Sequence, residues 1–383
     1  MNPAAEFDVI VYGATGYTGR LVAEHLARRY GVGGEVKWAM AGRSQAKLAQ
    51  VRDEIGAPAD TPLIVADAAD PASLDAMVRR TKAVITTVGP YQLYGDQLIA
   101  ACAAAGTDYL DLTGEPNWMA RTIAAHHETA QKTGARLCHS CGFDSIPFEL
   151  GVWFCEQTAK ERLGAPAPRV KGRVRAIKGG LSGGTAASGA ATMAAIQKDP
   201  SQLAVMMNPF ALTPGFEGPA QPPGNAKAHD DDIGAEVGPF MMAVINTKNV
   251  HRSNFLMGHP YGRDFQYDEM AIVAPGSDTE FTQLGDAGPK PGEGPSKEER
   301  ESGFFDLLFV GVAADGRKVR VSVKGEKDPG YGSTSMMIAE SAICLVKECP
   351  DVAGGVWTPG AAMQERLVRR LEANAAFTFT VED

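Results

Sequence analysis

Continuous apolar runs alternate with helical patterns along the first part of the chain. The run "FDVIVY" (7–12) is typical of a buried strand, and the residues after it place Leu21, Val22 and Leu26 at helical spacing. Further strands are predicted at 36–41, in the run that ends at Asp67, and within "KAVITTVGP", "TDYLDLTGEP" and "ARLCHSCGFDSIP". Strict alternation of strand and helix predicts an α/β fold with a Rossmann-type, doubly wound parallel sheet over residues 1–147.

The pattern changes near Pro147. A helix is predicted at 148–163, and a second helix is predicted at 190–198. Between them, charged and apolar residues alternate in "PRVKGRVRAIK". The Pro- and Gly-rich stretches 208–225 and 275–303 predict surface loops. In "FFDLLFVGVAADGRKVRVSVKGEK", Asp315-Gly316 predicts a hairpin. Residues 148–330 are therefore expected to form a second α+β domain built on an antiparallel sheet, and residues 331–383 to be mainly helical.

Three glycines stand between the first strand and the first helix. Gly13, Gly16 and Gly19 form a GxxGxxG spacing at this turn. Glycine lets the backbone approach a ligand closely, and the free amides of a helix N-terminus attract an anion. A Gly-rich turn in this context predicts a dinucleotide pyrophosphate site, in preference to a turn that binds no ligand.

The second strand leads into Arg43 and Ser44. Folds of this type that bind NAD usually place an acidic residue here, which hydrogen-bonds the ribose 2′-hydroxyl. A guanidinium instead pairs with a 2′-phosphate. The sequence therefore predicts NADP(H), and the alternative is a solvated surface arginine.

Composition and charge narrow the function classes. The chain has 383 residues, 44% of them hydrophobic and 22% charged, as expected for two globular domains. A net charge of −9 argues against nucleic acid or an anionic membrane as the main partner. No apolar run is long enough to span a bilayer, and the N-terminus lacks the features of a signal peptide, so a cytoplasmic protein is expected.

Cys138 and Cys141 form a CxxC with His139 between them. Such a pair could be a redox couple or half of a zinc site. Because no second pair lies at metal-ligand spacing, we favour small apolar residues at the end of a buried strand and expect no metal.

Several segments together resemble a known family. They are "YGATGYTGRLVAEHL", "MAGRS", "TTVGPYQLYGDQLIAACAAAG", "DYLDLTGEP" and "SCGFDSIPFELG". They are similar to the saccharopine dehydrogenase-like oxidoreductases, and most of all to the branch of trans-acting enoyl reductases that assist polyketide synthases. The resemblance implies a Rossmann domain with an inserted, mainly β second domain, and C-terminal helices that return to the first.

The resemblance also implies cofactor contacts. The pyrophosphate would be surrounded by Gly13, Thr15, Gly16, Tyr17, Thr18 and Gly19. Arg43 and Ser44 would hold the 2′-phosphate, and Asp67 would lie near the adenine. Gly89, Pro90 and Tyr91 would lie beside the nicotinamide ribose.

Candidate catalytic residues follow the strand ends. Reduction of a polarised double bond needs a hydride, a proton and a donor to the adjacent carbonyl. Tyr91, Tyr94, Asp144 and Ser145 are our candidates. Tyr91 could instead only stack on the cofactor. Asp144-Ser145 has the residue types of a helix N-cap, and this structural role is favoured for Asp144. Glu115 either binds substrate or ends its strand.

Three functions remain open. The first is an NADPH-dependent enoyl reductase for a hydrophobic acyl or polyketide-like substrate, free or carrier-bound. The methionine pairs 206–207 and 241–242 slightly favour it, because methionine adapts to apolar ligands. The second is an amino-acid dehydrogenase acting on an imine, for which Arg169, Arg173 and Arg175 could bind carboxylates unless they form a solvated face. The third is a non-catalytic NADP(H)-binding module. A homodimer is compatible with each.

Overall fold

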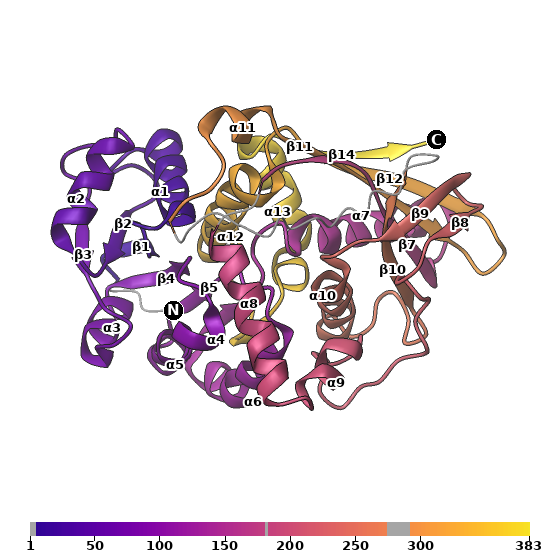
Figure 1. Ribbon diagram of the computed structural model, residues 1–383, viewed down its shortest axis with the longest axis horizontal. Coiled ribbons are helices and arrows are strands. Elements are labelled where there is room, and N and C mark those ends of the chain that lie inside the picture. The colour runs from indigo at the N-terminus through magenta and orange to yellow at the C-terminus, as the bar shows by residue number, and fades with distance from the viewer. Residues whose placement is uncertain (1–4, 181–182, 274–291) are drawn as a thin grey trace.

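The structure is a computed structural model that describes residues 5–180, 183–273 and 292–383. It contains two seven-stranded sheets, each with helices packed against it. In Figure 1 the first sheet lies on the left and the second on the right, with the C-terminal helices between them.

The first sheet is parallel throughout, with strand order β13-β6-β5-β4-β1-β2-β3. Its strands are β1 (Phe7–Tyr12), β2 (Trp38–Gly42), β3 (Leu63–Val65), β4 (Thr81–Thr86), β5 (Asp108–Leu110), β6 (Arg136–Cys138) and β13 (Gly355–Trp357). All six strands predicted in the N-terminal part are present, so the doubly wound Rossmann-type sheet is confirmed. The seventh strand, β13, was not predicted and comes from the C-terminal part.

Helices connect these strands. They are α1 (Tyr17–Tyr30), α2 (Gln45–Glu54), α3 (Pro71–Val78), α4 (Tyr91–Tyr94), α5 (Asp96–Ala105) and α6 (Pro116–Thr133). Local sequence fixes several ends. The Ser44 hydroxyl accepts the Lys47 amide 3.3 Å away at the start of α2. Gly106 ends α5 with a φ of 72°, which glycine adopts without strain.

The second sheet is mixed, with order β14-β12-β11-β7-β10-β9-β8. Its strands are β7 (Arg169–Lys178), β8 (Ala228–Asp230), β9 (Ala235–Pro239), β10 (Gln266–Ile272), β11 (Phe304–Val312), β12 (Lys318–Gly325) and β14 (Phe377–Glu382). The predicted hairpin is confirmed, since β11 and β12 pair antiparallel across Asp315-Gly316. The expectation of an antiparallel sheet needs one correction, because β7 and β10 are parallel.

The remaining helices differ in part from expectation. They are α7 (Ile146–Leu163), α8 (Gly183–Lys198), α9 (Gln202–Met207), α10 (Ala243–Leu256), α11 (Lys297–Ser302), α12 (Thr334–Glu348) and α13 (Pro359–Asn374), with a short π-helical turn η1 (Pro329–Ser333) before α12. The second helix begins seven residues before its predicted start at Ala190. Of the predicted loop 275–303, residues 275–291 lie outside the described residues, and α11 occupies part of the rest.

The C-terminal part serves both sheets. Helix α12 packs on α1, where Glu340 accepts hydrogen bonds from Tyr30 at 2.8 Å and lies 2.7 Å from His25. Arg370 of α13 lies 2.7 Å from the same carboxylate. The final strand, β14, does not return to the first sheet but pairs with β12 of the second.

Candidate active site

The three glycines of the first turn differ in what a side chain at each position would contact. Gly13 has a φ of +86°, and a Cβ there would lie 2.7 Å from Val88 Cγ2. A Cβ on Gly19 would lie 2.2 Å from the Gly13 carbonyl oxygen, so close packing excludes a side chain. Gly16 is exposed, and its Cβ would meet only that same oxygen, at 3.3 Å. The open face at Gly16 is therefore the part of the turn that a ligand could approach.

The N-terminus of α1 fits an anion. No side chain caps it, and its first turn, which contains the half-buried Thr18, holds no acidic residue. The amides of this turn therefore remain available for a pyrophosphate. The Tyr17 side chain is used elsewhere, because its hydroxyl donates to the Pro295 carbonyl and accepts from Arg300 Nη1 at 3.0 Å. Tyr17 can thus offer its main chain to the cofactor, while its ring lies against the segment that precedes α11.

Arg43 and Ser44 lie at the carboxyl end of β2. Arg43 is exposed and makes no hydrogen bond or ion pair with any described residue, so its guanidinium is available to a phosphate. Thr15 lies close by, since a Cβ on Gly42 would be 3.8 Å from its methyl carbon. Asp67 is half-buried beyond β3, where its carboxylate accepts the Ala69 amide at 3.0 Å. The structure thus brings these four predicted residues to one edge of the sheet.

Gly89 and Pro90 form the turn between β4 and α4. Two amides at the start of α4, those of Tyr91 and Gln92, donate to the two carboxylate oxygens of Glu115 at 2.9 and 2.8 Å. Glu115 therefore neither simply ends its strand nor stands free for a substrate. It holds the turn in place from the neighbouring loop.

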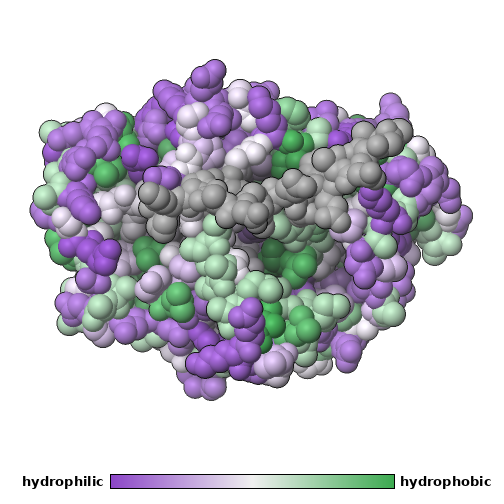
Figure 2. All heavy atoms as spheres, viewed as in Figure 1, coloured by the Kyte–Doolittle hydropathy of each residue, from purple (hydrophilic) through white to green (hydrophobic). Residues whose placement is uncertain are grey.

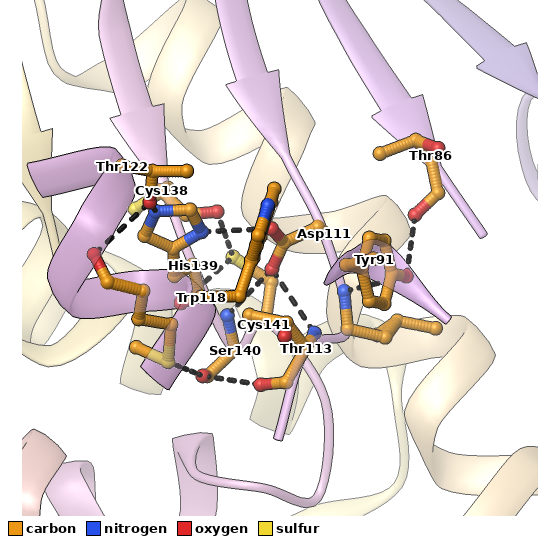
Figure 3. Close-up of polar contacts among 12 residues, drawn as sticks. Thr86, Tyr91, Asp111, Thr113, Trp118, Thr122, Cys138, His139, Ser140 and Cys141 are labelled. Atoms are coloured by element: carbon orange, nitrogen blue, oxygen red, sulfur yellow. Dashed lines mark hydrogen bonds and ion pairs between the residues drawn. The ribbon is translucent and has the colours of Figure 1, made fainter. Parts of the chain in front are cut away.

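Tyr91 is buried at the ends of β4 and β5 (Figure 3). Its hydroxyl donates to the Thr86 carbonyl and accepts the Leu112 amide, both at 3.1 Å. Its ring stacks on Trp118, with ring centroids 5.6 Å apart. Burial raises the pKa of the Tyr91 hydroxyl well above its ordinary value. In this arrangement the side chain joins two strand ends. Tyr94, the other tyrosine of α4, is exposed.

A buried polar network, not predicted from the sequence, joins the ends of β5 and β6. Asp111 Oδ2 lies 2.7 Å from His139 Nδ1, and Asp111 Oδ1 accepts the amides of Thr113 and Ser140 at 3.1 and 2.9 Å. The other ring nitrogen of His139 lies 3.1 Å from Thr122 Oγ1. Figure 3 shows these side chains converging between the strands. The network fixes the two loops that carry Gly114 and Asp144.

Asp144 lies in the loop after β6. Its side chain is half-buried and forms no hydrogen bond with any residue that the structure describes. Its Oδ2 lies 3.5 Å from the position that a Cβ on Gly114 would occupy. Burial raises the pKa of the Asp144 carboxyl to about 6, because the charged form is poorly solvated.

The predicted capping role for Asp144-Ser145 is wrong in its detail. Ser145 occupies the N-cap position of α7, but no side-chain hydrogen bond caps this helix. The Ser145 hydroxyl instead accepts from Asn249 Nδ2 of α10 at 2.8 Å. The neighbouring Asp144 carboxyl is therefore not committed to the helix.

Helix α10 adds polar residues that sequence reasoning missed. Besides the Asn249 contact with Ser145, Asn246 Nδ2 donates to Glu269 Oε1 at 2.7 Å, and Tyr267 donates to Glu269 Oε2 at 2.9 Å. Burial, and to a smaller extent the charge of Asp144, raises the pKa of Glu269 to about 8. Strand β10 of the second sheet thus places a second acidic group within electrostatic range of Asp144.

The arginines considered for substrate carboxylates are paired within the protein. Arg173 lies 2.7 Å from Asp230 and 2.9 Å from Asp268, and Arg169 also pairs with Asp268. Arg175 lies 2.7 Å from both Asp306 and Glu382. These guanidiniums support the second sheet and leave no free pair for a substrate.

The cysteines are free thiols and buried, and Cys141 Sγ lies 3.5 Å from the Cys138 carbonyl oxygen. Within residues 5–180, 183–273 and 292–383, no group of three or more His, Cys, Asp or Glu could hold a metal ion. In the same ranges no helix is long and apolar enough to cross a membrane.

Comparisons with known proteins identify the cofactor and the fold. Residues 9–138 match the saccharopine dehydrogenase NADP binding domain, which indicates NADP(H) as the cofactor. A solved structure of apo saccharopine dehydrogenase (L-Glu forming) from Saccharomyces cerevisiae shares the fold, with a TM-score of 0.57, 11% identity and coverage of 98% of this chain and 100% of that one.

Curated relatives match over nearly the whole length. A trans-acting enoyl reductase from Mycobacterium bovis is 37% identical over 410 residues, 97% of each chain. One from Mycobacterium ulcerans is 34% identical over 405 residues, 96% of each chain. This chain is an NADP-dependent oxidoreductase, and it belongs to the saccharopine dehydrogenase-like family, in the branch of the trans-acting enoyl reductases.

Proposed function

We propose that the protein uses NADPH to reduce the polarised carbon–carbon double bond of a hydrophobic enoyl substrate, with Asp144 as the proton donor. The observation that carries the assignment is the Asp144 carboxyl. It is half-buried, has no hydrogen bond to the described residues, and lies beside Gly114 at the end of the sheet where the nicotinamide is expected. The names of the relatives support the reaction class.

The chain's residues would divide the work as follows. The amides of the first turn of α1 hold the pyrophosphate of the cofactor, and the Arg43 guanidinium holds its 2′-phosphate. NADPH supplies the hydride when bound. Gly89 and Pro90, held through Glu115, form the wall beside the nicotinamide ribose. Asp144 passes its proton to the α-carbon of the substrate, and a pKa of about 6 leaves a useful protonated fraction near neutral pH.

Tyr91 has a positioning role in this proposal. Its hydroxyl already donates to a main-chain carbonyl, and burial raises its pKa, so it is a poor proton donor where it lies. The imine-reducing alternative loses its support, because the three arginines considered for it are paired with carboxylates.

The test measures NADPH oxidation and product mass with enoyl thioesters, with imines of amino acids as a second panel. Asp144→Asn should lower turnover by roughly 10²–10⁴, the usual contribution of a general acid, while NADPH binding is retained. Because the protonated form is the active one, kcat/KM of the native enzyme should fall as the pH rises through about 6. Oxidation only with the imines would refute the proposal, and no oxidation with either panel would favour a non-catalytic NADP(H)-binding module.

The setting of the reaction is part of the same proposal. We expect the substrate to arrive either free or on a carrier protein, in the cytoplasm, and the enzyme to form a homodimer. Mass photometry of the purified protein tests the last point directly.

A further inference from the structure

Exposed apolar side chains gather on one face of the molecule. Among the described residues, nine large hydrophobic side chains are exposed, and seven of them lie on α4, α8 or α9, or at or just before the start of α10. The seven are Leu93, Tyr94, Met193, Leu203, Met207, Met241 and Val244. We call this set the apolar strip. Figure 2 shows hydrophobic residues over the lower central part of this face, where Figure 1 places α8 and α9.

The strip is continuous across its four elements. Gln92 Nε2 of α4 donates to Thr192 Oγ1 of α8 at 3.3 Å. Lys248 Nζ of α10 donates to the Met206 carbonyl of α9 at 2.7 Å, and α8 leads directly into α9. These contacts make one surface of the four elements, and contiguous exposed apolar surface usually marks a binding site.

Ionic groups are also few along the strip. Residues 83–95, 179–197, 200–216 and 237–247 contain no Asp, Glu, Lys or Arg, in a chain that is 22% charged. The exceptions are Lys198 and Asp199, which are exposed at the junction of α8 and α9. A helix of 16 residues, about 24 Å long, normally buries an apolar stripe, but Gly183 is the one fully buried residue of α8. Residues 184–197 of α8, all uncharged, are half-buried or exposed, so this surface is open to a ligand.

One end of the strip reaches the cofactor end of the site. A Cβ on Gly89 would lie 3.6 Å from Ser188 Oγ of α8. The helix thus passes, at Ser188, beside the turn that is expected to contact the nicotinamide ribose, and it leads away from that point toward α9. This continuity favours, as the occupant, the part of the substrate that extends from the reacting double bond.

We infer that the apolar strip binds the hydrocarbon tail of a long acyl substrate, whose polarised end lies at Gly89 and Asp144. This inference rests on the proposed enoyl reduction and adds the surface of this chain that holds the tail of the acyl thioester. Unbranched methionine side chains suit this role, because they adapt to chains of differing length and branching. The scarcity of charge along the strip, where Lys198 and Asp199 are the exceptions, lowers the desolvation cost that ionic groups would add.

The experiment compares trans-2-enoyl N-acetylcysteamine thioesters of 4, 8, 12 and 16 carbons. Full burial of a methylene corresponds to roughly fourfold in affinity, so a half-covered surface should give roughly a twofold rise in kcat/KM per added methylene. Met193→Glu and Leu203→Glu should leave the rate with the four-carbon substrate unchanged and flatten the rise. Phe304→Glu is the matched control, since Phe304 is 42% exposed on β11, outside the strip.

A second measurement does not depend on turnover. Calorimetry with the saturated 12-carbon thioester should show binding that Met193→Glu weakens at least tenfold and Phe304→Glu does not, with circular dichroism confirming that each variant is folded. Turnover of the four-carbon substrate without any dependence on chain length would refute tail binding by the strip but not the proposed reduction. Binding of the saturated thioester without turnover of any enoyl thioester would refute the proposed reduction but not tail binding by the strip. A dimer that Leu203→Glu dissolves, with chain-length dependence unchanged, would make the strip a contact between two copies and overturn the inference.

Discussion

Replacing Arg43 by alanine tests how the protein chooses its cofactor. Arg43 is exposed and bonded to no described residue, so a 2′-phosphate gains the guanidinium without breaking an existing contact. A charge-assisted hydrogen bond contributes about 1.5–3 kcal/mol to binding. Solvent screening at an exposed site extends the lower end of this range, so we expect about 1–3 kcal/mol here. The native protein should therefore bind NADPH roughly 5–150 times more tightly than NADH.

Calorimetric titration with each dinucleotide measures this ratio. Arg43→Ala should weaken NADPH binding by most of the ratio and leave NADH binding unchanged, and added salt should shrink the native preference because the pair is exposed. Arg28→Ala is the matched control, since Arg28 is an exposed arginine near the far end of α1. Equal affinities in the native protein, or a preference that survives in Arg43→Ala, would refute the assignment of the 2′-phosphate to this residue.

Substitutions at four further residues test the site. Gly16→Val should keep the fold and abolish NADPH binding, whereas Gly19→Ala should destabilise the protein itself, because its Cβ would lie 2.2 Å from a carbonyl oxygen; thermal unfolding and calorimetry separate the two. Glu115→Ala leaves two amides of α4 unpaired and should cost about 2–4 kcal/mol in the free energy of unfolding, with Glu115→Gln costing less, as measured in urea. Tyr91→Phe should cost about 1–3 kcal/mol of stability and lower turnover less than tenfold; a loss of 10²–10⁴ would make Tyr91 the acid.

The sequence predicted the first sheet well because each of its strands is a continuous apolar run followed by helical spacing. The strands β13 and β14 were not predicted, because each follows a helix near the end of the chain and its partner lies far away in the sequence; β13 also has only three residues. The edge of the sheet that holds Gly13, Arg43 and Gly89 was also predictable, since carboxyl ends of parallel strands meet there.

The polar side of the site could not be predicted. Residues 246–254 of α10 are mostly polar, yet all of them except Thr247 are buried, because their partners, among them Ser145, Glu149 and Glu269, are supplied by other elements. Glu115 was similarly ambiguous, since its carboxylate serves amides 23 and 24 positions earlier in the chain. The periodicity of a segment shows which face of a helix or strand is apolar. It does not show which distant residue forms a hydrogen bond with a polar side chain of that segment.

The position of β13 has a consequence for how the protein is made. This strand completes the sheet beside β6, and buried Arg136 of β6 donates to the carbonyl of Cys349, 213 positions later in the chain. While a ribosome translates the strands of the second sheet up to β12, β6 is therefore an unpaired sheet edge, the kind of surface on which other strands can aggregate. The first sheet cannot be completed until β13 has been synthesised, and a nascent chain that stalls before residue 355 would expose that edge to chaperones and proteases.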